Sequence, residues 1–148
     1  MSLSPRLWPA AAFFFALVAS AAEPLPLLEI YKSATCSCCG AWEAHMKKAG
    51  FRIQTHTVAD VSASREKLGM PEQYASCHTA KVGGYLLEGH VPAEDVKRLL
   101  AERPKALGLA VPGMPLGAPG MESAQPQSYE SLLITANGHR VFVRHPAR

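Results

Sequence analysis

Three of the four cysteines in this chain fall within four residues, Cys36-Ser37-Cys38-Cys39, and the fourth is Cys77. The cluster follows the apolar run from Leu27 to Tyr31, which is typical of a short buried strand, and it precedes a helical pattern that begins at Gly40. Because neighbouring cysteines pair with each other only through a strained ring, a scaffold of two disulfides explains this spacing poorly. We therefore expect a group of thiols at the junction between the first strand and the first helix.

The rest of the chain predicts an alternating order of helices and strands. Periodicity and the Gly and Pro positions predict helices that begin at Gly40, Ser62 and Pro92 and end before Gly50, Gly69 and Pro104, and strands over 51–58, 79–82, 85–88, 131–135 and 140–144. Gly83-Gly84 and Asn137-Gly138 predict two hairpins, and the Gly- and Pro-rich segment 107–127 predicts a long loop. A βαβ unit followed by a hairpin and a helix is the thioredoxin-like order. The expected fold is therefore α/β and thioredoxin-like, with an extra C-terminal β-hairpin.

The first 21 residues have the pattern of a secretory signal peptide. Arg6 precedes the apolar run from Leu7 to Val18, and Ala19-Ser20-Ala21 supplies the small residues of a cleavage site. A retained membrane anchor is the alternative, but the run is short of the roughly 20 residues that a spanning helix needs. We expect a signal peptide over 1–21 and one metal-binding domain over 22–148, exported to the periplasm and free of the membrane after cleavage.

Composition excludes several classes of partner. The formal net charge is +3 without a basic block, and only 7% of the residues are aromatic. Nucleic-acid binding needs concentrated positive charge or a stacking platform, so we expect no nucleic-acid partner. With 48% hydrophobic residues, a chain of this length forms a core without a metal or disulfide staple, which argues against a purely structural zinc or disulfide module.

The thiol cluster has two chemical interpretations. Cys36 and Cys39 form a C-x-x-C pair at a helix N-terminus, where the helix dipole favours thiolate. Thiolate is the nucleophile of disulfide exchange, so one interpretation is a thiol–disulfide oxidoreductase with Cys36 as nucleophile and Cys39 as resolving residue. Thiolate is also a ligand for soft metals, which is the second interpretation.

Two further features favour the metal. Cys77-His78 stands where thioredoxin-like oxidoreductases carry a cis-proline, and the long loop contains Met114 and Met121. Thiolates and thioethers together select Cu(I) over zinc, calcium or magnesium. A four-cysteine zinc site typically has two separated C-x-x-C pairs, and this sequence has only one. Each of these residues also has an interpretation without metal. His78 is equally compatible with a hydrogen bond in a turn, and methionines such as Met114 and Met121 usually fill cores. We interpret His90 as a residue near a helix start.

Four segments closely resemble the CopG-like family of bacterial periplasmic copper-resistance and metal-binding proteins. They are Cys36-Ser37-Cys38-Cys39-Gly40, Ala75-Ser76-Cys77-His78-Thr79-Ala80, Gly89-His90-Val91-Pro92, and Val111-Pro112-Gly113-Met114-Pro115 together with Pro119-Gly120-Met121-Glu122. The resemblance covers nearly all of the expected mature chain. It implies a thioredoxin-like fold, copper bound by Cys36, Cys38, Cys39 and Cys77, sulfur-bridged multi-copper clusters and a role in copper redox or handling.

The sequence thus predicts a periplasmic Cu(I)-binding protein of copper homeostasis. Four thiolates exceed what one linear or trigonal Cu(I) needs, so we expect bridging thiolates and more than one copper per chain. The candidate metal ligands are Cys36, Cys38, Cys39, Cys77, His78, Met114 and Met121. The loop from Val111 to Met121 is expected to fold over the thiols, and the expected partners are copper ions and other periplasmic copper-resistance proteins. Enzymatic copper redox activity is left open.

Overall fold

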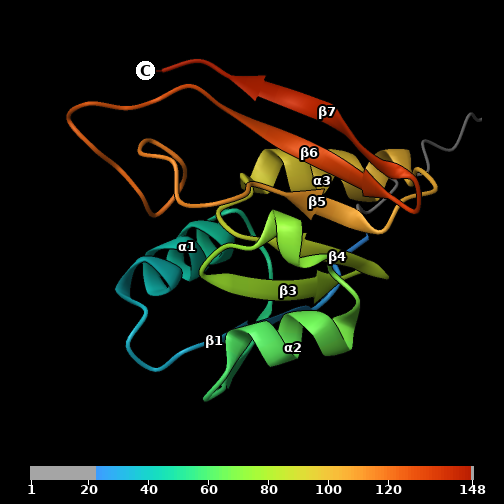
Figure 1. Ribbon diagram of the computed structural model, residues 1–148, viewed down its shortest axis with the longest axis horizontal. Coiled ribbons are helices and arrows are strands. Elements are labelled where there is room, and N and C mark those ends of the chain that lie inside the picture. Colours follow the sequence, from blue (N-terminus) through green and yellow to red (C-terminus); the bar gives the residue numbers. More distant parts are fainter. Residues whose placement is uncertain (1–22, 148) are drawn as a thin grey trace, which may run out of the picture.

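The computed structural model describes residues 23–147 (Figure 1). The expected signal peptide, residues 1–21, lies outside this part of the chain. The elements are β1 (Leu28–Lys32), α1 (Ser37–Lys48), β2 (Ile53–Thr57), α2 (Val61–Leu68), the short 3-10 helix η1 (Glu72–Tyr74), β3 (His78–Val82), β4 (Tyr85–Glu88), α3 (Ala93–Glu102), β5 (Gly108–Ala110), β6 (Tyr129–Thr135) and β7 (Gly138–His145). None of the helices in residues 23–147 has the length and apolar character needed to cross a membrane.

One mixed sheet runs through the described residues, in the order β2-β1-β3-β4-β5-β6-β7. The pairs β1–β2 and β4–β5 are parallel, and the other neighbours are antiparallel. The β1-α1-β2 unit, the β3–β4 hairpin and α3 confirm the thioredoxin-like prediction, and β6–β7 is the extra hairpin.

Strand β5 corrects the prediction of an uninterrupted loop over 107–127. Gly108, Leu109 and Ala110 are all buried and lie between β4 and β6, so β5 joins the C-terminal hairpin to the thioredoxin-like core. A three-residue strand that is buried on both faces has no alternating pattern to reveal it. The strand also needs its glycine, because a Cβ at Gly108 would overlap the Leu86 carbonyl group.

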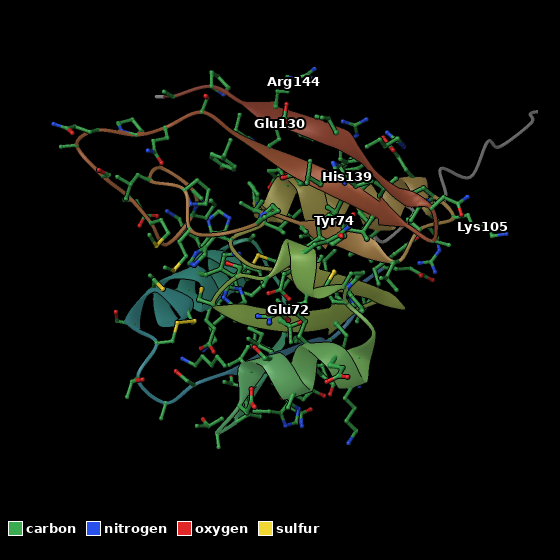
Figure 2. The ribbon with its side chains drawn as sticks, in the orientation of Figure 1. Glu72, Tyr74, Lys105, Glu130, His139 and Arg144 are labelled. Atoms are coloured by element: carbon green, nitrogen blue, oxygen red, sulfur yellow. A yellow bond between two sulfur atoms is a disulfide. The ribbon has the colours of Figure 1, made fainter. Side chains whose placement is uncertain are left out.

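The sheet separates two hydrophobic layers. Leu87, Leu109 and Leu133 pack with residues of α1 and α3 in the larger core cluster. Their neighbours Leu86, Ala110 and Ile134 face the other side, where Met70, Tyr74 and Leu68 pack. This alternation follows from the two-residue period of a strand. On that second side, the Tyr74 hydroxyl also bonds the His139 ring at 3.1 Å and ties η1 to β7 (Figure 2).

Helix α1 begins at Ser37, three residues earlier than the pattern predicts. Cys36 is the N-cap residue in an extended conformation, and its side chain makes no capping hydrogen bond. The usual start signal, a Ser, Thr, Asp or Asn side chain that accepts from the first turn, is therefore missing at this end. As a consequence, Cys38 and Cys39 belong to the first turn of the helix rather than to the preceding loop.

Candidate metal centre

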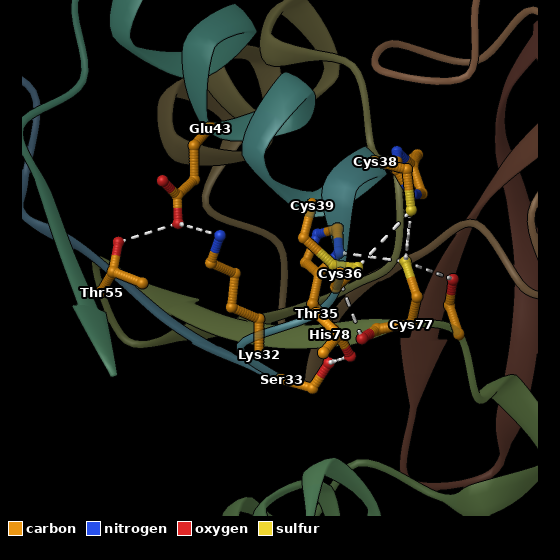
Figure 3. Close-up of a disulfide and its surroundings, with 12 residues drawn as sticks. Lys32, Ser33, Thr35, Cys36, Cys38, Cys39, Glu43, Thr55, Cys77 and His78 are labelled. Carbon is orange, nitrogen blue, oxygen red and sulfur yellow. Dashed lines mark hydrogen bonds and ion pairs between the residues drawn. A yellow bond between two sulfur atoms is a disulfide. The ribbon is translucent and has the colours of Figure 1, made fainter. Parts of the chain in front are cut away.

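The four cysteines come together because the end of β1 lies beside the start of the antiparallel strand β3. Lys32 at the end of β1 pairs with His78 at the start of β3, so Cys77, directly before β3, lies next to the segment that leads into α1. Cys36 and Cys39 form a disulfide. The Cys38 sulfur lies 3.5 Å from the Cys36 sulfur and 3.9 Å from the Cys77 sulfur (Figure 3). The predicted thiol cluster is thus a real group of four sulfur atoms, all within 4.8 Å of one another.

Two buried imidazoles extend this group. The Cys77 sulfur lies 3.4 Å from Nδ1 of His78 and 3.0 Å from Nε2 of His90. Both histidine side chains are fully buried. Cys77, His78 and His90 therefore form a second group of metal-ligating atoms, and Cys77 belongs to both groups.

His90 joins this group of potential ligands, although the sequence predicted only a residue near a helix start. Thr79 pairs with Glu88 in the β3–β4 hairpin, so residues just after β4 lie beside residues just before β3. That register brings His90 to Cys77. The signal was available, because the Gly83-Gly84 hairpin itself predicts that the two strand ends meet.

Hydrogen bonding sets the tautomer of His90. Its Nδ1 lies 2.7 Å from the Pro119 carbonyl oxygen, which can only accept, so Nδ1 carries the proton. In the neutral ring, Nε2 then presents its lone pair to Cys77. The His78 ring faces Cys77 through Nδ1, and its Nε2 is buried without a hydrogen-bond partner among the described residues.

Burial keeps Cys77, His78 and His90 uncharged in the metal-free protein. It lowers the pKa of His78 to about 3, aided by the nearby His90, and it also lowers the pKa of His90. Burial, reinforced by the neighbouring Cys38, raises the pKa of Cys77 to about 12. At pH 7 the neutral thiol of Cys77 therefore contacts two neutral imidazoles. The donor atoms are sulfur and nitrogen, which fits a soft or borderline metal ion rather than calcium or magnesium.

Trp42 of α1 forms one wall of the site. The centroids of the Trp42 and His78 rings are 4.4 Å apart, and Nε1 of Trp42 donates to the Val91 carbonyl oxygen at 2.8 Å. The side chain is completely buried. Trp42 thus fixes both the ring of His78 and the backbone that follows His90.

The loop after β5 lies against the start of α1. Gly120 has φ +83°, and a Cβ there would lie 2.7 Å from the backbone nitrogen of Trp42 and 2.9 Å from the carbonyl oxygen of Cys38. Only glycine fits both constraints. Within the loop, Met114 is 53% exposed and Met121 is partly buried. Ligation by either thioether stays a prediction.

Fold and site together define a class: a thioredoxin-like domain whose C-x-C-C thiols meet a buried Cys-His pair and a further histidine. Two solved structures, both of the copper resistance protein CopG (forms 1 and 2), match this chain with a TM-score of 0.78 and 40% sequence identity, over 84% of this chain and 100% of theirs. The chain belongs to the family of the copper resistance protein CopG.

A family described as "Protein of unknown function, DUF411" matches residues 74–121. This segment holds Cys77, His78 and His90 as well as the loop with Met114 and Met121. No curated protein matches the chain.

Proposed function

We propose that this protein is an exported, periplasmic copper-binding protein of copper homeostasis and resistance, which holds Cu(I) through its cysteine thiolates. The observation that carries the proposal is the pair of donor groups that share Cys77: four sulfur atoms on one side, and Cys77 with two imidazoles on the other. A thiolate common to two groups suits a bridge between two metal ions, so more than one copper per chain is part of the proposal. The name of the similar CopG structures supports copper as the metal.

Binding through all four thiols requires changes in protonation and oxidation state. A thiol reductant must first transfer two electrons and two protons to the Cys36–Cys39 disulfide, which gives two thiols and leaves the reductant as a disulfide. Each ligating thiol then releases its proton to the solvent when the metal binds, including that of Cys77, whose pKa of about 12 keeps it protonated in the metal-free protein. His78 and His90 need no such step, because burial already keeps them neutral.

Anaerobic titration of the reduced protein with Cu(I) tests the proposal. The wild-type chain is expected to bind copper with a thiolate-to-copper charge-transfer absorption, and the Cys36→Ser/Cys38→Ser/Cys39→Ser variant is expected to lose most of this binding. Ser37→Ala, within the same segment, is the matched control and should bind as the wild type does. Equal copper binding by the triple variant would contradict the proposal.

A thiol–disulfide oxidoreductase is the second candidate function, and the Cys36–Cys39 disulfide is the observation that favours it. In that case a thiol reductant first reduces the Cys36–Cys39 disulfide and is itself oxidised to a disulfide. The Cys36 thiolate then attacks a disulfide of the substrate, and Cys39 resolves the mixed disulfide, which restores the Cys36–Cys39 disulfide and releases the substrate as two thiols. Cys38→Ser separates the two functions because it leaves the C-x-x-C pair intact. Efficient reduction or oxidation of a generic disulfide substrate that copper does not diminish and that this variant retains in full would favour the oxidoreductase.

The methionines of the loop give a further prediction. Because the loop lies against α1, we expect Met114 and Met121 to shield the copper and to tune its access to solvent and oxidant. Met114→Leu/Met121→Leu should leave the copper stoichiometry nearly intact but change the rate of air oxidation or of copper transfer to a chelator. Met70→Leu, in the core on the other side of the sheet, is the control. Unchanged rates in the double variant would remove both methionines from the site.

A further inference from the structure

A buried ion pair lies behind the segment that carries Cys77. The Arg65 side chain of α2 is 2% exposed and the Glu88 side chain of β4 is fully buried, and Nε of Arg65 lies 3.0 Å from Oε1 of Glu88. Arg65 also donates through Nη1 to Ser62 at 3.1 Å and to Glu72, which is labelled in Figure 2, at 2.9 Å. Nε and Nη1 of the guanidinium group are thus both hydrogen-bonded to other side chains, Nε to a buried one and Nη1 to two exposed ones.

The two charged side chains hold the backbone of Ser76 from both sides. The Ser76 N–H donates to Oε1 of Glu88 at 2.7 Å, and Nη2 of Arg65 donates to the Ser76 carbonyl oxygen at 2.8 Å. Ser76 directly precedes Cys77, so its peptide groups set the direction in which the Cys77 side chain leaves the chain. The Ser76 hydroxyl bonds the Gly113 carbonyl oxygen in addition, which ties the same residue to the loop that carries Met114.

Stability alone does not account for this pair. Removing two charges from water costs several kcal/mol each, and apolar side chains of similar volume often stabilise a protein as well or better. Oε2 of Glu88 adds to the cost, because it is buried without a hydrogen-bond partner among residues 23–147. What apolar side chains cannot supply is a donor for one side of a peptide and an acceptor for the other.

We propose that the Arg65–Glu88 ion pair is a positioning device, which fixes the Ser76 backbone and thereby holds the Cys77 thiol beside His90. Residues 75–77, directly before β3, contain no proline, and the side-chain hydrogen bonds of the pair set the backbone conformation there. The consequence for copper rests on the proposed function, but the positioning itself concerns the metal-free protein.

Hydrogen exchange of the Ser76 amide tests this inference without metal. Arg65→Lys keeps a buried positive charge but has one nitrogen in place of three, so it cannot reach Glu88 and the Ser76 carbonyl oxygen together. In the disulfide form of this variant, we expect the Ser76 amide to exchange about tenfold faster relative to the core amides of β1. A merely structural role would accelerate Ser76 and the core amides by the same factor. Arg144→Lys, in the exposed pair with Glu130, is the matched control and should change neither.

A second variant covers the case in which Arg65→Lys does not fold. Arg65→Met/Glu88→Met replaces the pair by apolar side chains and is expected to keep a stable fold. Its Ser76 amide should still exchange about tenfold faster relative to the core amides of β1. After reduction, both variants should bind Cu(I) about tenfold more weakly than the wild type, as measured by competition with a chelator. Unchanged relative exchange at Ser76 would overturn the inference. A wild-type protein without copper affinity would overturn the proposed function and leave the exchange result standing.

Discussion

Trp42→Ala is expected to lower the unfolding free energy of the metal-free protein by about 3–5 kcal/mol, a large part of the stability of a domain this size. Trp42 is among the largest fully buried side chains and belongs to the core cluster between the sheet and the two helices α1 and α3. Its removal leaves a cavity beside His78 and leaves the Val91 carbonyl oxygen without its donor. Urea unfolding of the disulfide form measures the loss.

Trp42→Phe separates packing from the hydrogen bond. A six-membered ring remains in the core beside His78, while the bond from Nε1 to Val91 and the packing of the pyrrole part of the indole are lost, which should cost about 1–3 kcal/mol. If Trp42→Ala unfolded at the same urea concentration as the wild type, the described packing between α1 and the site would be wrong. If the phenylalanine variant lost as much as the alanine variant, the hydrogen bond rather than the cavity would carry the effect.

Acid is expected to destabilise the metal-free protein through His78. The pKa of this residue falls from its ordinary value of 6.5 to about 3 in the folded state, because burial and the nearby His90 disfavour the imidazolium. Between these two pH values, the unfolded chain binds a proton at His78 that the folded chain does not. Stability therefore falls as the pH falls from about 6.5 towards 3, by about 1.4 kcal/mol per pH unit from this group alone.

Urea unfolding at pH 7 and at pH 4.5 tests this prediction by comparison with His78→Gln. The variant should show a weaker loss of stability on acidification than the wild type, since it lacks the group that must be kept neutral. His56→Gln is the matched control, because the His56 side chain is a third exposed and lies at the surface, where its Nε2 is 3.3 Å from Oε2 of Glu29. The same pH dependence in wild type and His78→Gln would contradict a buried, uncharged His78.

The sequence predicted the parts of the structure that depend on local pattern. The strand–helix junction, the two hairpins and α2 with its Gly69 end are each encoded by periodicity and turn residues within a short segment. The approach of Cys77 to the C-x-C-C thiols was also predictable, because the thioredoxin-like order brings the start of the hairpin to the junction. Assignment of Cys36, Cys38, Cys39 and Cys77 to one cluster followed from these two facts.

Other parts depend on contacts that no local pattern shows. Strand β5 is defined by its pairing with β4 and β6, which no pattern within its three residues predicts. The Arg65–Glu88 pair joins residues of α2 and β4 that nothing in the sequence connects. His90 lies between these cases. Its position follows from the hairpin register, but its role depends on the bond to Pro119 that orients the ring.

The central claim, copper held by cysteine thiolates, is tested most directly by metal analysis combined with copper X-ray absorption on protein purified with the metal that it binds in the cell. The account predicts copper as the bound metal, more than one ion per chain, and a first coordination shell dominated by sulfur. The Cys36→Ser/Cys38→Ser/Cys39→Ser variant, purified in parallel, should lose this sulfur shell. Zinc as the bound metal, or copper surrounded only by nitrogen and oxygen with the four cysteines intact, would contradict the account.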